Sequence, residues 1–192
     1  MPSPAINTLL SSNAAVASSN YTAPPTFAQF GEAMKTAGPD SARLCIVTCV
    51  DPRCDANQFY ALPSHPKIFS IVLRNAGGSP RKALPDILAI DTLVHFTDLL
   101  VVRHTDCGSL IFRDNDIRAE LKARLSSSSA NETMLGQELD GMCFGECTTS
   151  AAEMCREDVQ WLKNNVLVRE DLRAGIWGGV FDLSTGRVEG VA

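Results

Sequence analysis

Three kinds of reactive side chain lie close together in the segment Cys49-Val50-Asp51-Pro52-Arg53-Cys54, which follows an apolar run. A thiol, a carboxyl group and a guanidinium occupy the alternate positions Cys49, Asp51 and Arg53. In an extended backbone alternate side chains project from the same side, so we expect these three to face one site. A thiol suits metal binding, while the acid and the guanidinium suit an ion pair beside the metal.

Two further polar clusters end the next apolar runs along the chain. Arg74 and Asn75 close the second run, and His104, Asp106 and Cys107 close the third. Ligands of open parallel sheets bind at the carboxyl ends of the strands. If the three runs are parallel strands, their polar ends meet at one site.

Cys49, His104 and Cys107 together have the composition of a zinc site. Zinc accepts thiolate and imidazole in tetrahedral geometry, and catalytic zinc sites use three protein ligands with a fourth position open. The spacing His-x-x-Cys lets one tight turn supply two ligands, with Cys49 as the third. A single cysteine at a strand end is more often a buried apolar residue, but the coincidence with Asp51 and Arg53 favours Zn²⁺ binding.

The elements that position these residues are three runs that are nearly continuous in apolar and β-branched residues. Such runs indicate strands buried on both faces, as in a parallel sheet. A helix-like segment between the second and third runs fits a crossover connection. The sequence therefore predicts an α/β fold with a parallel-cored β-sheet flanked by helices. The strands are predicted at Arg43–Cys49, Lys67–Gly77 and Asp98–Gly108, and the crossover helix at Ala83–Phe96.

The remainder of the chain divides at about residue 38. Residues 1–25 are rich in Ser, Ala, Asn and Pro and predict a mobile or weakly helical arm, and Thr26–Gly38 predicts a short helix. We expect residues 1–38 to form an N-terminal arm and helix, and residues 39–192 to form the zinc-binding catalytic domain.

Two later segments carry no predicted chemistry. Thr148–Val168 has helical periodicity behind a cap-like start and predicts a packing helix. Ser126–Cys147 predicts a loop with a short helical piece. Cys143 and Cys147 would align on a helix, but without a histidine nearby they do not predict a second metal site.

Length and composition are those of an ordinary globular protein. The chain has 192 residues, of which 45% are hydrophobic and 20% charged, and a formal net charge of -5. The acidic balance argues against nucleic acid and against anionic membranes as partners. Residues 1–31 carry no charged side chain, and no apolar run reaches the roughly 18 residues of a membrane span. We expect a cytoplasmic protein whose seven cysteines are thiols and metal ligands.

The motifs "CVDPRC", "RNAGG" and "HTDCG", in this order and spacing, resemble those of the β-class carbonic anhydrases. The closing segment "GGVFDLSTGRVEGV" is similar to the terminal strand, turn and strand of that family. The resemblance implies that Cys49, His104 and Cys107 bind zinc and that Asp51 and Arg53 form a catalytic dyad. It also implies a homodimer or homotetramer whose N-terminal arm contacts a partner.

The implied activity is the reversible hydration of carbon dioxide to bicarbonate. Zinc lowers the pKa of bound water to about 7, which provides hydroxide for attack on a small electrophile. Asp51 would orient the hydroxide, and Arg53 would keep Asp51 away from the metal. His65 and His95, the remaining histidines, are expected to be structural rather than proton shuttles.

Two alternative functions stay open. The chain also resembles carbonyl sulfide hydrolases and carbon disulfide hydrolases, which share these motifs. The second alternative is a non-catalytic zinc protein in which Asp51 permanently fills the fourth metal position.

Overall fold

A computed structural model describes the chain apart from residues 1, 20, 37, 39–40, 126–131 and 192. It divides into two compact units, Met1–Gly38 and Pro39–Ala192. Each unit is described by itself below. Within the described residues, every helix is too short or too polar to span a bilayer.

The first unit consists of α1 (Pro4–Ser18) and α2 (Phe27–Thr36). The segment expected to be at most weakly helical forms a regular helix in α1. Its serine and threonine hydroxyls donate to carbonyls one turn back, as from Ser11 to Asn7, so these polar side chains are satisfied within the helix. The short helix expected at Thr26–Gly38 is confirmed by α2.

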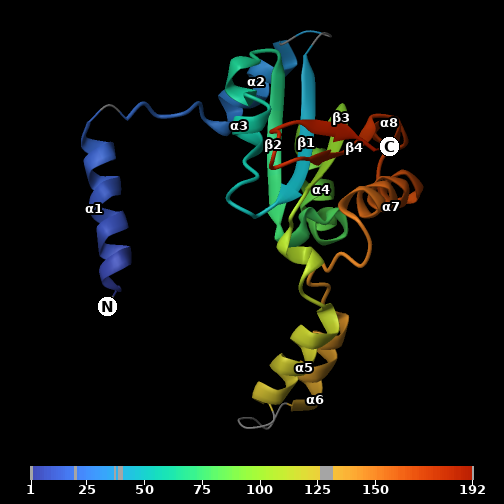
Figure 1. Cartoon of the computed structure of the whole chain (residues 1–192). Helices are drawn as coiled ribbons and strands as arrows, with labels where there is room; N and C mark the ends of the chain where they lie inside the picture. Colours follow the sequence, from blue (N-terminus) through green and yellow to red (C-terminus); the bar gives the residue numbers. More distant parts are fainter. Residues whose placement is uncertain (1, 20, 37, 39–40, 126–131, 192) are drawn as a thin grey trace. The chain divides into compact units, whose positions relative to one another are not determined.

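The second unit is built on a five-stranded sheet with the strand order β2-β1-β3-β4-β5 (Figure 1). β1 pairs in parallel with β2 and with β3, and β3 pairs in parallel with β4. The last strand pairs antiparallel with β4, so the closing segment is the expected strand, turn and strand. The predicted fold class is confirmed. The strands are β1 (Ala42–Cys49), β2 (Ile68–Asn75), β3 (Asp98–His104), β4 (Ile176–Phe181) and β5 (Val188–Gly190).

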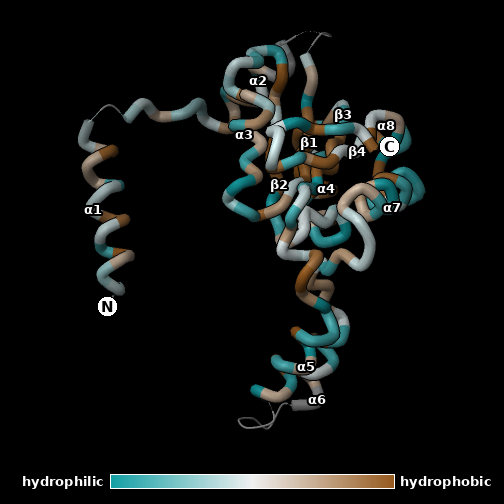
Figure 2. The backbone as a smooth tube through the Cα atoms, viewed as in Figure 1, coloured by the Kyte–Doolittle hydropathy of each residue, from teal (hydrophilic) through white to brown (hydrophobic). Residues whose placement is uncertain are grey.

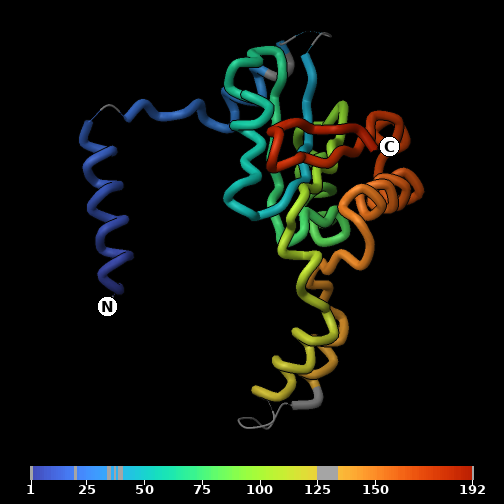
Figure 3. Tube along the Cα trace, viewed as in Figure 1, coloured from blue at the N-terminus to red at the C-terminus, as the bar shows by residue number. Residues whose placement is uncertain are grey.

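Two long helices, α4 (Pro80–Val94) and α7 (Ala151–Asn164), pack against the sheet and contact each other (Figure 3). α4 is the expected crossover between β2 and β3, and α7 is the expected packing helix. Gly178 of β4 lies so close to α7 that a Cβ there would be 2.6 Å from a methyl group of Val159. The short helix α8 (Glu170–Ala174) leads into β4.

An apolar cluster joins β1, β3 and β4 to the short helix α3 (Ala56–Phe59). Phe59 stacks on Phe181 with ring centroids 4.3 Å apart. Cys45 and Cys54 are fully buried and serve as packing residues. Figure 2 shows the apolar residues concentrated in the strands at the centre of the sheet.

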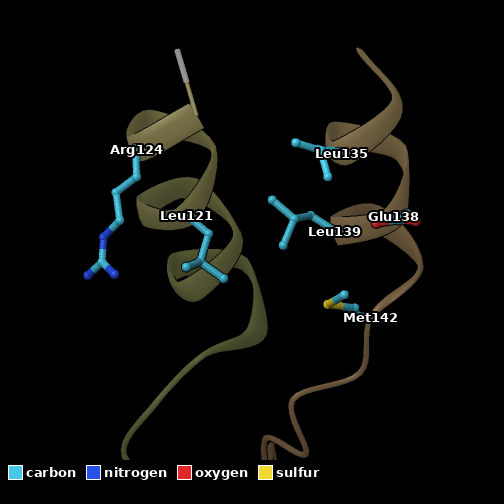
Figure 4. A pocket seen from close by; sticks show the side chains of 6 residues that line it. All are labelled: Leu121, Arg124, Leu135, Glu138, Leu139 and Met142. Carbon is cyan, nitrogen blue, oxygen red and sulfur yellow. The ribbon is translucent and has the colours of Figure 1, made fainter. Parts of the chain in front are cut away.

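The helices α5 (Asp114–Leu125) and α6 (Glu132–Gly141) pack against each other. The sequence did not predict α5, whereas α6 is the short helical piece expected in Ser126–Cys147; residues 126–131 lie outside the described part. Leucine side chains from the two helices line an apolar pocket of about 240 Å³ (Figure 4). At the base of the pair, Asp114 accepts hydrogen bonds from the backbone N–H groups of Phe144 and Glu146.

Candidate metal centre

The three predicted zinc ligands lie together at the carboxyl ends of two neighbouring strands. Cys49 is the last residue of β1, His104 is the last residue of β3, and Cys107 follows in the next turn. Their donor atoms all lie within 4.8 Å of one another, and all three residues are buried. In the part of the chain that the structure describes, this is the only such group of three or more His, Cys, Asp or Glu side chains.

The geometry of the cluster fits a tetrahedral zinc ion. Zn–S bonds of about 2.3 Å at a tetrahedral angle place two sulfur atoms about 3.8 Å apart. The Sγ atoms of Cys49 and Cys107 are 3.8 Å apart. The buried His104 Nε2 atom has no hydrogen-bond partner among the described residues, while Nδ1 lies 2.8 Å from the carbonyl oxygen of Thr105. A carbonyl partner on one ring nitrogen is the usual arrangement for a histidine whose other nitrogen binds a metal.

Polar groups around the cluster stabilise its two cysteines as thiolates. The hydroxyl of Ser109 donates to Cys107 Sγ at 3.1 Å, and the backbone N–H of Asp51 donates to Cys49 Sγ at 3.5 Å. Sequence reasoning missed Ser109, and its place two residues after a ligand was the only available signal.

The two sulfur atoms also perturb each other. Their mutual hydrogen bond raises the pKa of Cys49 and lowers the pKa of Cys107, because one thiol donates to the other as a thiolate. Burial is the largest influence on the pKa of His104 and lowers it, but the interactions with Cys107, the Thr105 backbone and Asp51 together leave that pKa raised. Two sulfur atoms this close do not both ionise readily, because their negative charges would repel each other. A bound cation would stabilise both as thiolates.

Asp51 and Arg53 meet through a turn and not through an extended strand, so the expected extended backbone is wrong. The backbone N–H of Cys54 donates to the carbonyl oxygen of Asp51 at 2.9 Å, which closes a turn with Pro52 at its second position. Pro52 favours this turn because its ring fixes φ. The Asp51 carboxylate accepts the backbone N–H of Arg53 at 2.9 Å.

Within this turn the predicted dyad is an ion pair. Arg53 donates from Nε and Nη2 to the Asp51 carboxylate, with a shortest distance of 2.7 Å. These hydrogen bonds lower the pKa of Asp51 to about 2. Arg74, at the end of β2, donates to the carbonyl oxygens of Cys49 and Asp51 and so fixes the backbone on both sides of Val50.

The glycine pair of "RNAGG" allows a loop to lie against the metal centre. Gly78 has φ 63°, and a Cβ at this position would lie 3.0 Å from the backbone nitrogen of Cys49. Gly77, with φ 78°, would place a Cβ 2.5 Å from the carbonyl oxygen of Gly145. Only glycine combines these dihedral angles with such close backbone approach.

The segment "CFGEC" is not helical, so Cys143 and Cys147 are not aligned as on a helix. Cys143 is exposed and Cys147 is buried. The Cys147 backbone N–H donates to the carbonyl oxygen of Ser109, which attaches this segment to the turn that follows Cys107. The described residues include no second cluster of metal ligands.

A buried ion pair connects the metal centre to α7. Arg103, next to His104, donates to Asp158 Oδ2 from Nε at 2.9 Å and from Nη2 at 2.6 Å. Its third donor nitrogen binds the carbonyl oxygen of Gly77 at 2.9 Å. Arg103 therefore fixes β3, α7 and the glycine loop relative to one another.

The two other histidines contact different parts of the fold. His95 follows α4 with φ 56°, and its Nε2 lies 3.1 Å from Arg169. His65 ends a short 3₁₀ turn and lines a small apolar pocket on the sheet. The structural roles expected for both remain predictions.

Comparisons with known proteins agree with the motifs. No family model matches the chain. β-carbonic anhydrase 1 of Mycobacterium tuberculosis is 27% identical over 154 residues, which cover 80% of this chain and 84% of that protein. The structure of a carbonic anhydrase from Streptococcus mutans is 26% identical, with a TM-score of 0.70 and full coverage of both chains. The apo form of carbon disulfide hydrolase is 24% identical over 84% of each chain, with a TM-score of 0.60. The resemblance to β-carbonic anhydrases that the motifs predicted is confirmed.

Proposed function

We propose that this chain, as a relative of the β-carbonic anhydrases, is a zinc-dependent carbonate dehydratase that reversibly hydrates carbon dioxide to bicarbonate. The observation that carries the proposal is the cluster of Cys49, His104 and Cys107. The sulfur atoms of its two cysteines are 3.8 Å apart, as expected for two ligands of a tetrahedral zinc ion. The named relatives supply the reaction, since the M. tuberculosis and S. mutans proteins are carbonic anhydrases.

The cluster would hold zinc through two thiolates and one imidazole. When bound there, zinc would lower the pKa of water to about 7 and so supply a nucleophile at neutral pH. His104 presents Nε2 because Nδ1 is engaged by the Thr105 carbonyl oxygen. Ser109 reduces the charge density on Cys107 by its hydrogen bond.

Asp51 is the hydrogen-bond acceptor beside the cluster. Its pKa of about 2 keeps the carboxylate ionised at neutral pH, so it accepts hydrogen bonds and does not act as an acid. The guanidinium of Arg53 engages both carboxylate oxygens and limits rotation of the group. The hydrogen bonds from Arg53 argue against the non-catalytic alternative, in which the Asp51 carboxylate would bind the metal.

The metal assignment is tested by measuring bound zinc in purified variants. We expect Cys49→Ala and His104→Ala to lose most of the zinc, because two ligands seldom retain the ion. Cys143→Ala is the matched control, since it removes an exposed thiol and should keep one zinc per chain. Full zinc occupancy in either ligand variant would disprove the assignment.

The roles of Asp51 and Arg53 are tested by stopped-flow hydration of carbon dioxide with zinc-loaded variants. Asp51→Asn should keep zinc but lower kcat by roughly 10²-fold, because the anionic acceptor is lost. Arg53→Ala should also lower kcat, because it releases the carboxylate. Unchanged rates in both variants with zinc bound would refute these roles.

Carbonyl sulfide is the alternative substrate, since the same nucleophile could attack its carbon and release hydrogen sulfide. We favour carbon dioxide because the M. tuberculosis and S. mutans carbonic anhydrases, at 27% and 26% identity, match slightly better than the carbon disulfide hydrolase, at 24%. Side-by-side measurement of both reactions with one enzyme preparation decides between them. If kcat/KM is higher for carbonyl sulfide and hydration of carbon dioxide stays at the background rate, the protein is a carbonyl sulfide hydrolase and not a carbonic anhydrase.

A homodimer or homotetramer with contacts from residues 1–38 is part of the proposal. α1 buries none of its residues, and Ile6, Leu9, Leu10 and Val16 are between 49% and 69% exposed. Such an apolar surface is stabilised when another chain covers it. Light scattering of the intact chain is expected to give a dimer or larger, and a monomer would contradict this part.

A further inference from the structure

Arg53 is held by two different turns. On one side it binds the Asp51 carboxylate. On the other side its Nη1 donates to Asp106 Oδ2 at 2.9 Å, and its Nη2 donates to the carbonyl oxygen of Asp106 at 3.1 Å. The guanidinium is therefore bound along two of its edges.

Asp106 is placed for this contact by an unusual backbone conformation. It lies between His104 and Cys107, in the turn that carries two of the candidate metal ligands. Its φ is 53°, in the left-handed region that aspartate and asparagine tolerate better than most residues. Both its carbonyl oxygen and its carboxylate reach Arg53 from this conformation.

The hydrogen bonds leave Arg53 little rotational freedom. A guanidinium has five N–H donors, and the bonds to Asp51 and Asp106 together engage Nε and both Nη groups. Without the Asp106 carboxylate, Nη1 loses its partner, and on this side Arg53 keeps only the weaker hydrogen bond from Nη2 to the Asp106 carbonyl oxygen. The orientation of Asp51 would then be less well defined.

Stability alone does not account for the second ion pair. The side chains of Arg53 and Asp106 are 50% and 78% exposed. Exposed ion pairs contribute little to folding, because solvent screens them. A fixed orientation matters more at this position, since Arg53 connects the turn of the dyad to the turn of the metal ligands.

We propose that Asp106 is a positioning residue that clamps Arg53 and thereby fixes the Asp51 carboxylate beside the metal centre. The effect on turnover rests on the proposed reaction, whereas the effect on the metal site rests only on metal binding by Cys49, His104 and Cys107. Asp106 completes a linked trio, Asp51–Arg53–Asp106, in which the arginine is shared by two carboxylates.

Three substitutions separate the clamp from backbone strain. Asp106→Gly removes the carboxylate and suits a positive φ, so it removes the side-chain part of the clamp without strain and keeps the carbonyl contact. Asp106→Asn keeps an oxygen acceptor and also tolerates this conformation. Asp106→Ala loses the acceptor and adds strain. We expect kcat to fall about tenfold to a hundredfold in the Gly and Ala variants, with KM little changed, and to stay within about threefold in the Asn variant.

A readout that needs no turnover is the visible absorption spectrum of Co²⁺ bound in place of zinc. This spectrum reports the ligand set and geometry of the metal. We expect Asp106→Gly to shift the spectrum in the same direction as Arg53→Ala, and Asp106→Asn to keep the wild-type spectrum. Melting temperatures of the Gly and Asn variants should stay close to wild type, which excludes general unfolding as the cause.

The outcomes distinguish the clamp from the proposed function. A wild-type enzyme without hydration activity would overturn the proposed function, and the Co²⁺ spectra would still test the clamp. An Asp106→Gly variant with wild-type kcat and a wild-type Co²⁺ spectrum would overturn the clamp. The same result for Asp106→Ala would overturn it independently.

Discussion

Asp158→Asn should strongly destabilise the fold, because it breaks the buried ion pair with Arg103. The two side chains are 1% and 4% exposed, and their closest N–O distance is 2.6 Å. Asparagine keeps the shape of aspartate but removes its charge, so the Arg103 guanidinium would remain buried without an anion. The contact between Arg103 and the Gly77 carbonyl oxygen cannot replace that charge.

The magnitude follows from this burial. Removing one partner of a buried ion pair costs about 3–5 kcal/mol. Domains of this size lose about 2–4 °C of melting temperature per kcal/mol, so we expect a decrease of roughly 6–20 °C. This loss is a large share of a total stability of about 5–15 kcal/mol.

The assay is urea denaturation at neutral pH together with thermal melting, on variants that match in chemistry and differ in burial. Asp140→Asn is the control. Asp140 pairs with Lys122 at the same 2.6 Å, but these side chains are 60% and 44% exposed. We expect this variant to lose at most about 1 kcal/mol.

A double variant tests the cause of the loss. Arg103→Met with Asp158→Leu removes both buried charges. The Gly77 carbonyl oxygen then loses its donor, at a cost of about 1–3 kcal/mol, and Arg81, which is 45% exposed, loses a longer contact of 3.9 Å with Asp158. The double variant should therefore be more stable than the sum of the single losses predicts. The reasoning is refuted if Asp158→Asn costs no more than Asp140→Asn, or if the two single losses simply add.

Three more predictions concern packing, pH and metal. Gly178→Ala should lower the free energy of unfolding by about 1–3 kcal/mol, because its methyl group would overlap Val159, and Val159→Ala should restore part of this loss. Gly136→Ala, with open space around it, should be neutral or stabilising in urea denaturation. Hydrogen bonds from Ser150 lower the pKa of Glu153, so its contribution is present above the unfolded value of 4.5 and is lost as pH falls through the folded pKa. The stability difference between wild type and Glu153→Gln should shrink from pH 7 to pH 3; a constant difference would contradict this. Chelation of zinc should lower the melting temperature, and excess zinc should restore it.

The sequence predicted the sheet and the clustering of its polar ends for one physical reason. Strands buried on both faces are nearly continuous in apolar residues, so a cluster of polar residues marks where each run ends. β1 ends in Thr48-Cys49 and β3 in Arg103-His104, and parallel pairing brings the two strand ends together. The site could be located because topology, and not local geometry, determines it.

Local geometry was less predictable. The turn from Asp51 to Cys54 depends on side-chain hydrogen bonds that spacing alone does not show. The left-handed conformation of Asp106 has no signal in the residue type, since most aspartates have negative φ. α5 was missed because half of the residues of "DNDIRAELKARL" are charged, and its apolar residues, such as Leu121, face α6.

The separation of the candidate ligands along the chain has a kinetic consequence. His104 and Cys107 are close in sequence, but the sulfur atoms of Cys49 and Cys107 are 58 residues apart. Closing a loop of this length costs about 3–4 kcal/mol of chain entropy, so the third ligand joins only after β1 has paired with β3. In the unfolded chain a metal ion could find only the local pair. We therefore expect zinc to extend the lifetime of the folded state by slowing unfolding, with little effect on the rate of folding.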